Sequence, residues 1–287
     1  MAQSRLHQDL HCPACAATTR HTLLFEKNGC DILRCRACGL GRADAVGFDP
    51  ARYYTKGYFS GRHADGYSDY LATEPVLRAQ FKREVEFVRG FCPSGRLVEI
   101  GCAYGFFLEE AQARFEVAGV ELAKDAAAHC RRAGLNVLTG VADNQNLDRL
   151  GLADVVLLLD VIEHLPDPFD TLERCAKHLK PHGLIVLTTG DFGSPAARLA
   201  GVRWRLMTPP QHLWYFTLEC IRIWARRTGM RLEAYDHPAK IVPFSLIVFQ
   251  LGRMLGWQSS AVRGSRIGIP VNLFDAVRIV LRQVPAP

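Results

Sequence analysis

The spacing of apolar residues changes near residue 95 of this 287-residue chain. From there to residue 190, short and nearly continuous apolar runs alternate with segments in which apolar residues recur every three or four positions. The apolar runs predict strands at 96–100, 116–122, 136–140, 154–161 and 183–190. The intervening segments predict helices at 106–113, 124–132 and 169–179. Near-continuous apolar strands separated by amphipathic helices are typical of a parallel sheet covered on both faces, so we expect an α/β fold.

The segments on either side of this alternation are less regular. A stretch rich in Tyr, Gly and Phe precedes a helical pattern at 75–91, and we interpret it as an ordered loop or lid. The later elements are a helix at 218–229, a strand at 231–237, an apolar segment at 242–256 and a last strand near 275–282. We predict three parts, namely residues 1–45, a lid or helical linker at 46–92, and a domain at 93–287 with an apolar insertion at about 241–272.

Composition narrows the class of protein. Hydrophobic residues make up 48% of the chain and charged residues 22%, which is ordinary for a globular protein and argues against disorder. The first residues lack the apolar core of a signal peptide. The most apolar late segment is interrupted by Gln250 and Arg253 and is too short to span a bilayer. We expect a cytoplasmic protein.

Charge is unevenly distributed along the chain. The net charge is +6, and the part from residue 201 onward contains 12 Lys and Arg residues against 4 Asp and Glu residues. Such a basic region could meet a phosphorylated or otherwise acidic partner, including a membrane surface. A solvated helix face around Arg222 and Arg226 is the simpler interpretation.

Two Cys-x-x-Cys pairs stand near the start of the chain, at Cys12, Cys15, Cys35 and Cys38. Nineteen residues with two β-type segments separate the pairs, which is typical of a zinc ribbon because each short loop lets two thiolates converge on one cation. Two disulfides are the competing interpretation, but nothing in the sequence indicates export. Four thiolates leave no open coordination position, so we predict a structural zinc ion. His11 and Cys30 are possible substitute ligands.

The sequence VEIGCAYG (98–105) ends the first strand of the α/β part and turns through two glycines. A dinucleotide site requires Gly-x-Gly-x-x-Gly, which would place Ala103 and Phe106 where glycines are needed. S-adenosylmethionine is an adenosine compound without a pyrophosphate, and its methionine part can lie over the turn from Gly101 to Gly105. A nearby acid, Glu99, suits its positive charges.

A second carboxylate, Glu121, ends the next predicted strand. A carboxylate at that strand end can accept hydrogen bonds from both ribose hydroxyls, as it does in dinucleotide sites. The glycine turn and Glu121 together therefore predict an S-adenosylmethionine site more specifically than the glycines alone.

Three further motifs add to this pattern, namely DVIEHLPDP (160–168), LKPHGLIVLTT (179–189) and GVRWRLMTPPQHLWYFT (201–217). Together with the glycine turn, they resemble the class I S-adenosylmethionine-dependent methyltransferases, in particular a bacterial small-molecule branch with an N-terminal CxxC/CxxC zinc ribbon. The resemblance covers residues 11–40 and roughly 95–237. It implies a Rossmann-like sheet of seven strands, the last antiparallel to the others, with helices on both faces.

The resemblance also implies contacts with the cofactor. Asp160 would lie near the methionine amino group. Many relatives hold the adenine with an acid where this chain has Val141, so that Asp143 or the backbone alone would take that part. The implied cofactor-binding residues are Glu99, Gly101, Cys102, Ala103, Gly105, Glu121, Leu122, Asp143, Asp160 and Val161.

Two histidines are candidates for catalysis. Methyl transfer is an in-line displacement that depends on positioning, and a hydroxyl acceptor gains further from a general base. His164 follows the fourth strand of the sheet and has an intrinsic pKa suited to a base, with Glu163 beside it. His212 is the second candidate. The plainer interpretation is that Glu163 and His164 orient the following loop and that His212 packs in an aromatic cluster.

We therefore expect a methyltransferase acting on a small biosynthetic acceptor, such as a sugar, glycan, lipid or phenol, with O-methylation favoured. The alternative is a nucleic-acid or ribosome-associated methyltransferase that binds through the ribbon and the basic C-terminal region. The ribbon is almost neutral, however, since residues 1–50 hold 6 Lys and Arg and 5 Asp and Glu residues. The apolar segment 242–256 could form a lid, a dimer contact, a peripheral membrane contact or, most simply, buried packing.

Overall fold

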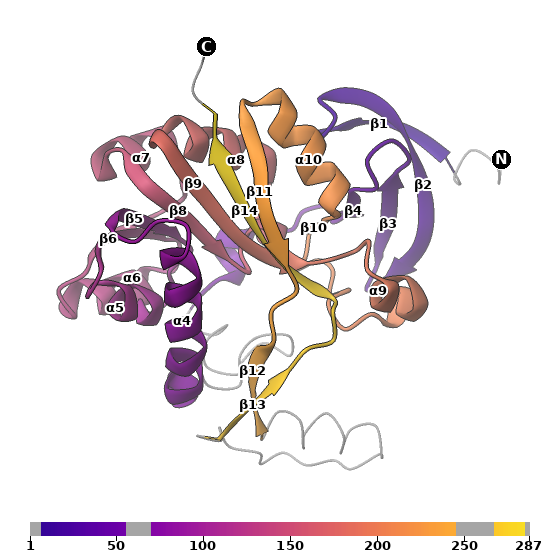
Figure 1. The fold of residues 1–287 in the computed structure, drawn as a ribbon. Helices are drawn as coiled ribbons and strands as arrows, with labels where there is room; N and C mark the ends of the chain where they lie inside the picture. Colours follow the sequence, from indigo (N-terminus) through magenta and orange to yellow (C-terminus); the bar gives the residue numbers. More distant parts are fainter. Residues whose placement is uncertain (1–6, 56–69, 245–266, 285–287) are drawn as a thin grey trace. The chain divides into compact units, whose positions relative to one another are not determined.

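A central seven-stranded sheet and a smaller five-stranded sheet organise the chain (Figure 1). The computed structural model describes residues 7–55, 70–244 and 267–284. Contacts group the chain into two units. Unit 1 comprises Met1–Pro50, Ala142–Pro238 and Leu273–Pro287, and unit 2 comprises Ala51–Val141 and Ala239–Asn272.

The central sheet has the strand order β11-β14-β9-β8-β5-β6-β7. Unit 2 supplies β5 (Gly95–Ile100), β6 (Phe115–Glu121) and β7 (Asn136–Thr139), which are parallel to one another. Unit 1 supplies β8 (Ala153–Leu159), β9 (Leu179–Gly190), β11 (Met230–Asp236) and β14 (Ala276–Gln283). Strand β14 is antiparallel to both β9 and β11. The Rossmann-like sheet with an antiparallel last strand is therefore confirmed.

The helices of unit 2 follow the predicted alternation. They are α4 (Glu74–Arg89), α5 (Phe106–Ala111) and α6 (Lys124–Arg132), preceded by α2 (Pro50–Tyr53) and η1 (Leu71–Thr73). Helix α4 is tied to α5 by Arg78, whose guanidinium donates to Glu110 at 2.9 Å and also to Glu109. Two short strands, β12 (Lys240–Pro243) and β13 (Gly268–Val271), pair with each other.

Unit 1 contains more helical turns than the sequence predicts. Besides the expected α8 (Pro168–Lys177) and α10 (Leu218–Arg227), it has α7 (Asn144–Leu150), α9 (Pro195–Ala200), η2 (Ile162–His164) and η3 (Gly201–Arg203). The strands are apolar because they are buried on both faces, as Val155, Val156, Leu157 and Leu158 of β8 show by being at most 1% exposed.

The five-stranded sheet contains the four N-terminal strands of the ribbon and one further strand from a distant part of the chain. Its strands are β1 (His7–Cys12), β2 (Ala17–Lys27), β3 (Cys30–Cys35) and β4 (Gly41–Asp44), and β4 pairs with β10 (Trp214–Tyr215) from the segment between η3 and α10. A Cβ at Gly41 would lie 2.8 Å from the Phe192 ring, so this close approach requires glycine. In Figure 1 α10 lies beside the ribbon strands, and Arg227 of α10 donates to the Ala14 carbonyl at 2.9 Å.

Three predictions concern residues only partly covered by the structure. Residues 56–69 of the expected lid and residues 245–266 of the apolar insertion lie outside the described residues, so the dimer or membrane contact through 242–256 stays a prediction. The division into domains at residues 45 and 92 also stays a prediction. Within the described ranges, no helix is long and apolar enough to cross a membrane.

Candidate methyltransferase site

The turn between β5 and α5 bends sharply through residues with positive φ. The φ angles are 72° at Gly101, 47° at Ala103 and 80° at Gly105. A Cβ at Gly105 would lie 2.6 Å from Leu135 Cδ1 and 2.9 Å from Cys130 Sγ. The second glycine is therefore required by left-handed backbone and by close packing of the turn within unit 2.

Phe106 explains why the third glycine of a dinucleotide site is absent. Its ring is 2% exposed and stacks on Tyr70 at a centroid distance of 5.7 Å. The position is thus part of an aromatic cluster with Tyr104, where a glycine would leave a cavity.

Glu121 at the end of β6 holds the turn with its carboxylate. One oxygen accepts from the Ala103 N–H and the other from the Ala123 N–H, both at 2.7 Å. The side chain is 5% exposed, and burial raises its pKa although these backbone hydrogen bonds act in the opposite direction. A carboxylate has about four acceptor positions, so the hydrogen bonds from Ala103 and Ala123 alone do not use all of them.

Glu99 at the end of β5 is a second buried acid in unit 2. It is 4% exposed, and its Oε2 has no hydrogen-bond partner. Burial raises its pKa well above the usual value, and the neighbouring Glu121 carboxyl group adds to this effect. A buried and unsatisfied carboxylate beside another acid suits a cationic ligand, because the ligand would supply the missing charge compensation. This observation fits S-adenosylmethionine.

Asp160 follows β8 in unit 1 and has a φ of 54°. Thr188 of β9 fixes it, because the Thr188 hydroxyl donates to Asp160 Oδ1 at 2.9 Å and the Asp160 N–H donates to the Thr188 carbonyl at 3.1 Å. The Asp160 residue is exposed, and Val161 next to it precedes η2. Thr188 therefore orients the Asp160 carboxylate at the end of β8, where the sequence places it.

Glu163 and His164 are held by partners that the sequence does not reveal. Glu163 is 4% exposed and accepts from the Thr189 hydroxyl at 2.9 Å. His164 Nδ1 lies 2.9 Å from the Gln211 carbonyl, which accepts only if Nδ1 carries the proton. That tautomer leaves Nε2 as a proton acceptor. Burial lowers the pKa of His164, more than the Gln211 hydrogen bond and the Asp160 charge raise it, so the neutral form is favoured near pH 7.

His212 lies against His164, with ring centroids 4.7 Å apart and the planes at 73°. Its carbonyl also accepts from the Tyr215 hydroxyl at 3.2 Å. The donor atoms of Glu163, His164 and His212 all lie within 4.8 Å of one another, a spacing at which they could also bind a metal ion. The structure thus brings the three predicted catalytic side chains together.

Asp143 caps a helix. Its Oδ1 accepts from the Asn146 N–H at 2.8 Å at the start of α7, which is the usual part of an N-cap residue. Its contact with adenine stays a prediction. Of the remaining residues of the predicted cofactor set, Cys102 lies within the turn between β5 and α5, and Leu122 directly follows β6 in unit 2.

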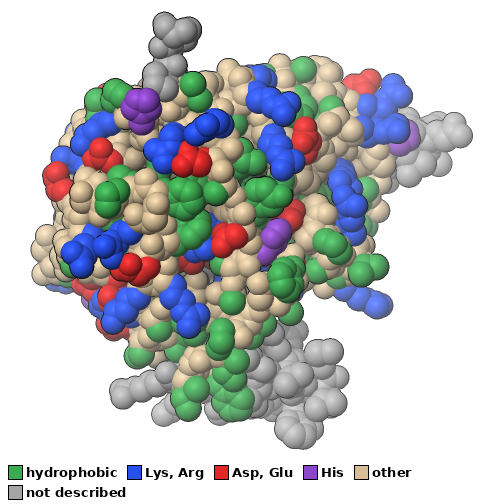
Figure 2. Space-filling model, in the orientation of Figure 1, with side chains coloured by type: hydrophobic (Ala, Val, Ile, Leu, Met, Phe, Trp, Pro, Cys, Tyr) green, Lys and Arg blue, Asp and Glu red, His purple; other side chains and the backbone are tan. Residues whose placement is uncertain are grey.

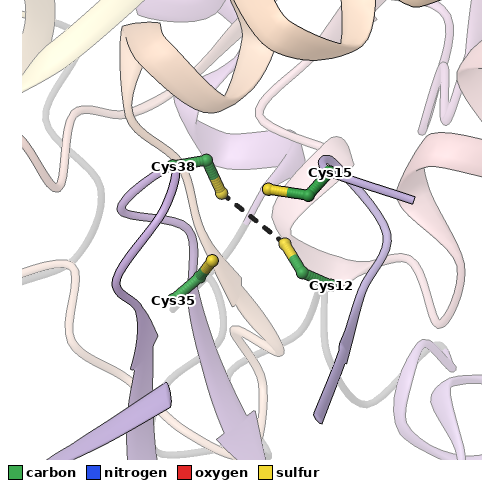
Figure 3. Close-up of side chains that lie close together, drawn as sticks. All are labelled: Cys12, Cys15, Cys35 and Cys38. Carbon is green, nitrogen blue, oxygen red and sulfur yellow. Dashed lines mark hydrogen bonds between the residues drawn. The ribbon is translucent and has the colours of Figure 1, made fainter. Parts of the chain in front are cut away.

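The four cysteines of the ribbon converge on one point, as Figure 3 shows. Their sulfur atoms all lie within 4.8 Å of one another, and those of Cys12 and Cys38 are 3.5 Å apart. Tetrahedral zinc with bonds of about 2.3 Å separates its sulfur ligands by roughly 3.8 Å, so the cluster fits this ion. Cys30 instead packs in the apolar cluster around Tyr215, and His11 does not belong to the group.

Comparison with known proteins agrees with this geometry. The family described as Methyltransferase domain matches residues 73–235. The chain is 30% identical over 196 residues to a ubiquinone biosynthesis O-methyltransferase of Methylococcus capsulatus, a match covering 61% of this chain and 81% of that protein. It is 36% identical over 133 residues to the protein of the same name from Caulobacter sp., covering 42% of this chain. The match spans about half of the Caulobacter protein, 52% of its length.

Solved structures share the fold. A SAM-dependent methyltransferase from Archaeoglobus fulgidus aligns with a TM-score of 0.50 at 19% identity, covering 75% of this chain and 99% of that one. A possible histamine N-methyltransferase from Thermotoga maritima aligns with a TM-score of 0.50, covering 78% and 98%. The fold is therefore that of the class I S-adenosylmethionine-dependent methyltransferases. The chain belongs to the methyltransferase domain family, which confirms the predicted class of enzyme.

Proposed function

We propose that the protein transfers a methyl group from S-adenosylmethionine to an oxygen atom of a small biosynthetic acceptor, such as a sugar, glycan, lipid or phenol. The names of the relatives favour oxygen as the accepting atom. The observation that carries the proposal is the state of His164, since its Nδ1 is engaged by Gln211 and its lowered pKa keeps Nε2 free of a proton. A neutral imidazole of this kind is suited to accept the proton of a hydroxyl group.

Each unit carries one part of the predicted set of cofactor-binding residues. In unit 2 Glu121 would accept the ribose hydroxyls, and the turn from Gly101 to Gly105 would cover the methionine part. In unit 1 Asp160 would hold the methionine ammonium group, because the residue is exposed and Thr188 orients its carboxylate. When bound, S-adenosylmethionine supplies an electrophilic methyl group. The residues of the chain then contribute position and acceptance of a proton.

We also propose that the four ribbon thiolates hold one structural zinc ion. The ribbon strand β4 pairs with β10, which begins two residues after His212. Additional support comes from the Ala43 N–H, which donates to the Leu213 carbonyl at 2.9 Å. The metal would thereby stabilise the segment that orients His164.

Replacing His164 by Ala tests the proposed base. If His164 accepts the proton, the rate of methyl transfer falls by about 10²- to 10⁴-fold while the affinity for S-adenosylhomocysteine changes little. The matched control is His182→Asn, because His182 is an exposed histidine with a φ of 65° that Asn tolerates. The acceptor itself is identified by incubating extracts with the enzyme and isotopically labelled S-adenosylmethionine. A His164→Ala rate equal to that of the control would assign His164 a structural role.

The face shown in Figure 2 has mixed charge. On the face shown in Figure 2, Lys and Arg side chains are interspersed with Asp and Glu side chains and do not gather in one basic stripe. Nucleic-acid binding by electrostatics needs such a stripe or patch. Weak retention on heparin at moderate salt is therefore expected. The cytoplasmic location stays a prediction.

A further inference from the structure

A cavity of about 550 Å³ opens in unit 1 beside the second cysteine pair of the ribbon. Its lining combines residues from β2, β3 and the loop after β3, the segment after β9, α9 and the first turn of α10. The charged and capping side chains among them are Arg34, Arg36, Asp191, Arg198, Thr217 and Glu219. This cavity plays no part in the site described above.

The three arginines of the cavity lack partners within the described part of the chain. Arg34, Arg36 and Arg198 form no side-chain hydrogen bond and no ion pair there, although Arg34 lies 5.5 Å from the centroid of the Phe192 ring. Arg205 of unit 1, by contrast, pairs with Asp275 at 2.7 Å. Three guanidinium groups without an ion pair among the described residues therefore line one cavity.

The guanidinium group of Arg34, a residue of β3, lies near the N-terminus of α10. The position of a Cβ on Gly39 would be 3.3 Å from Arg34 Nη2 and 3.5 Å from Thr217 Oγ1, so the guanidinium and the N-cap of α10 are close neighbours. Thr217 caps this ten-residue helix by accepting from the Cys220 N–H. A cation at a helix N-terminus is unfavourable, because the N-terminus itself carries a partial positive charge. A bound anion would relieve both charges at once.

The two carboxylates of the lining do not neutralise the arginines. Asp191 Oδ1 accepts from the Gly193 N–H at 2.9 Å, and its Oδ2 lies 3.2 Å from His237 Nε2. Glu219 pairs with Arg222 at 3.7 Å. Both acids thus have partners other than the three guanidinium groups.

The cavity is close to the strand that supports the predicted catalytic residues. Asp191 directly follows β9, and Thr189, two residues earlier, donates to Glu163. Two residues along a strand span about 7 Å. A small molecule whose reacting hydroxyl lies at His164 could therefore place in this cavity a group that is about one sugar or one phosphate unit distant from that hydroxyl.

We propose that the cavity binds a phosphate or diphosphate group carried by the methyl acceptor. This inference rests on the proposed function and names its substrate class, a phosphorylated small molecule. Three guanidinium groups and a helix N-terminus match an anion of two or more negative charges better than a single carboxylate, because each guanidinium offers a fork of donors to phosphate oxygens. Arg34, fixed over Phe192, is the anchoring group, and Arg36 and Arg198 are the exposed groups that close around the anion.

Calorimetric titration of the zinc-loaded full chain with inorganic pyrophosphate tests the proposal directly. The variants are Arg36→Ala and Arg198→Ala, both at exposed positions where folding is little affected. Each is expected to weaken pyrophosphate binding by about tenfold or more, as loss of a charge-assisted hydrogen bond does. The matched control is Arg226→Ala, since Arg226 is an exposed arginine in the last turn of α10, away from the cavity lining. All titrations are made at one ionic strength.

Absence of pyrophosphate binding, or equal weakening by all three variants, would overturn the proposal. A parallel titration with S-adenosylhomocysteine separates the two claims. If that compound binds and pyrophosphate does not, the inference fails while the proposed function stands; if S-adenosylhomocysteine does not bind, the proposed function fails.

A phosphatase treatment distinguishes a phosphorylated acceptor from a separate anion. Extracts treated with phosphatase before incubation with labelled S-adenosylmethionine should lose incorporation of the label if the acceptor carries the phosphate. Unchanged incorporation would contradict the assignment to the acceptor, and a labelled product sensitive to nuclease would replace it with a nucleic acid.

Discussion

Replacing Gly105 by Ala tests how much the second glycine of the turn contributes to the stability of the protein without a ligand. Two costs follow from the structure. The φ of 80° places a Cβ in the left-handed region, at about 1–2 kcal/mol. The new Cβ would also lie 2.6 Å from Leu135 Cδ1, and overpacking of this kind costs about 1–3 kcal/mol. Gly105→Ala should therefore destabilise the protein by about 2–5 kcal/mol.

Urea unfolding of the ligand-free protein measures this effect. Gly134→Ala is the matched control, because Gly134 has a φ of 83° but no atom within 4 Å of its Cβ position, so that only the first cost applies. Adding Leu135→Ala to Gly105→Ala removes the clashing methyl group, so the Gly105 substitution should cost less in that background. Equal unfolding midpoints for Gly105→Ala and Gly134→Ala would refute the packing argument.

Three further predictions follow from the thiolates, the buried acids and the histidine. Cys35→Ser should release the zinc ion, of which the wild type contains about one per chain by metal analysis, and should lower the melting temperature; a fully folded metal-free protein would contradict this. Burial raises the pKa of Glu99 in the folded protein above its value of about 4.3 in the unfolded chain. The stability that protonated Glu99 contributes is therefore fully present below about pH 4.3, and it is lost as the pH rises through the pKa of the folded state. Glu99→Gln should therefore gain stability relative to wild type as the pH rises, seen in melting curves at several pH values, and should bind S-adenosylmethionine less tightly; a constant difference would refute this. Because burial lowers the pKa of His164, the methyl-transfer rate should rise with pH and level off below about 6.5, the ordinary histidine value. A midpoint above that value would contradict the assignment.

The positions of most strands and the cysteine cluster were predictable because their signals are local. Strands such as β5 and β8 are short apolar runs buried on both faces, and the observed bounds differ from the predicted ones by one or two residues. The Cys-x-x-Cys spacing similarly constrains each loop by itself. In both cases a few neighbouring residues determine the structure.

Elements and contacts that depend on distant residues were not predictable. Helix α7 has only two buried apolar residues, Leu147 and Leu150, and so lacks a helical period, although Asp143 followed by Asn146 could have been recognised as a capping pattern. The two-residue strand β10 exists because it pairs with β4 in the ribbon, about 170 residues away. No local pattern carries such a pairing.

The residues that orient the site side chains were also not predictable, because they are distant from them in the sequence. Thr188, Thr189 and Gln211 orient Asp160, Glu163 and His164, yet each lies some 26 to 47 residues from its partner. The only available signal was the pair of threonines at the end of an apolar strand, in LTTG. Polar residues at the carboxyl end of a buried strand are candidates for hydrogen bonds that orient the acidic residues of a neighbouring strand.

Calorimetric titration of the purified protein with S-adenosylmethionine, S-adenosylhomocysteine and NAD tests the central claim most directly, because Glu99 and Glu121 are assigned to one cationic nucleoside and its neutral-sulfur product. Binding of the first two compounds with a stoichiometry near one, weakened by Glu121→Gln, and no binding of NAD is the predicted result. Binding of NAD without binding of either sulfur compound would contradict the account.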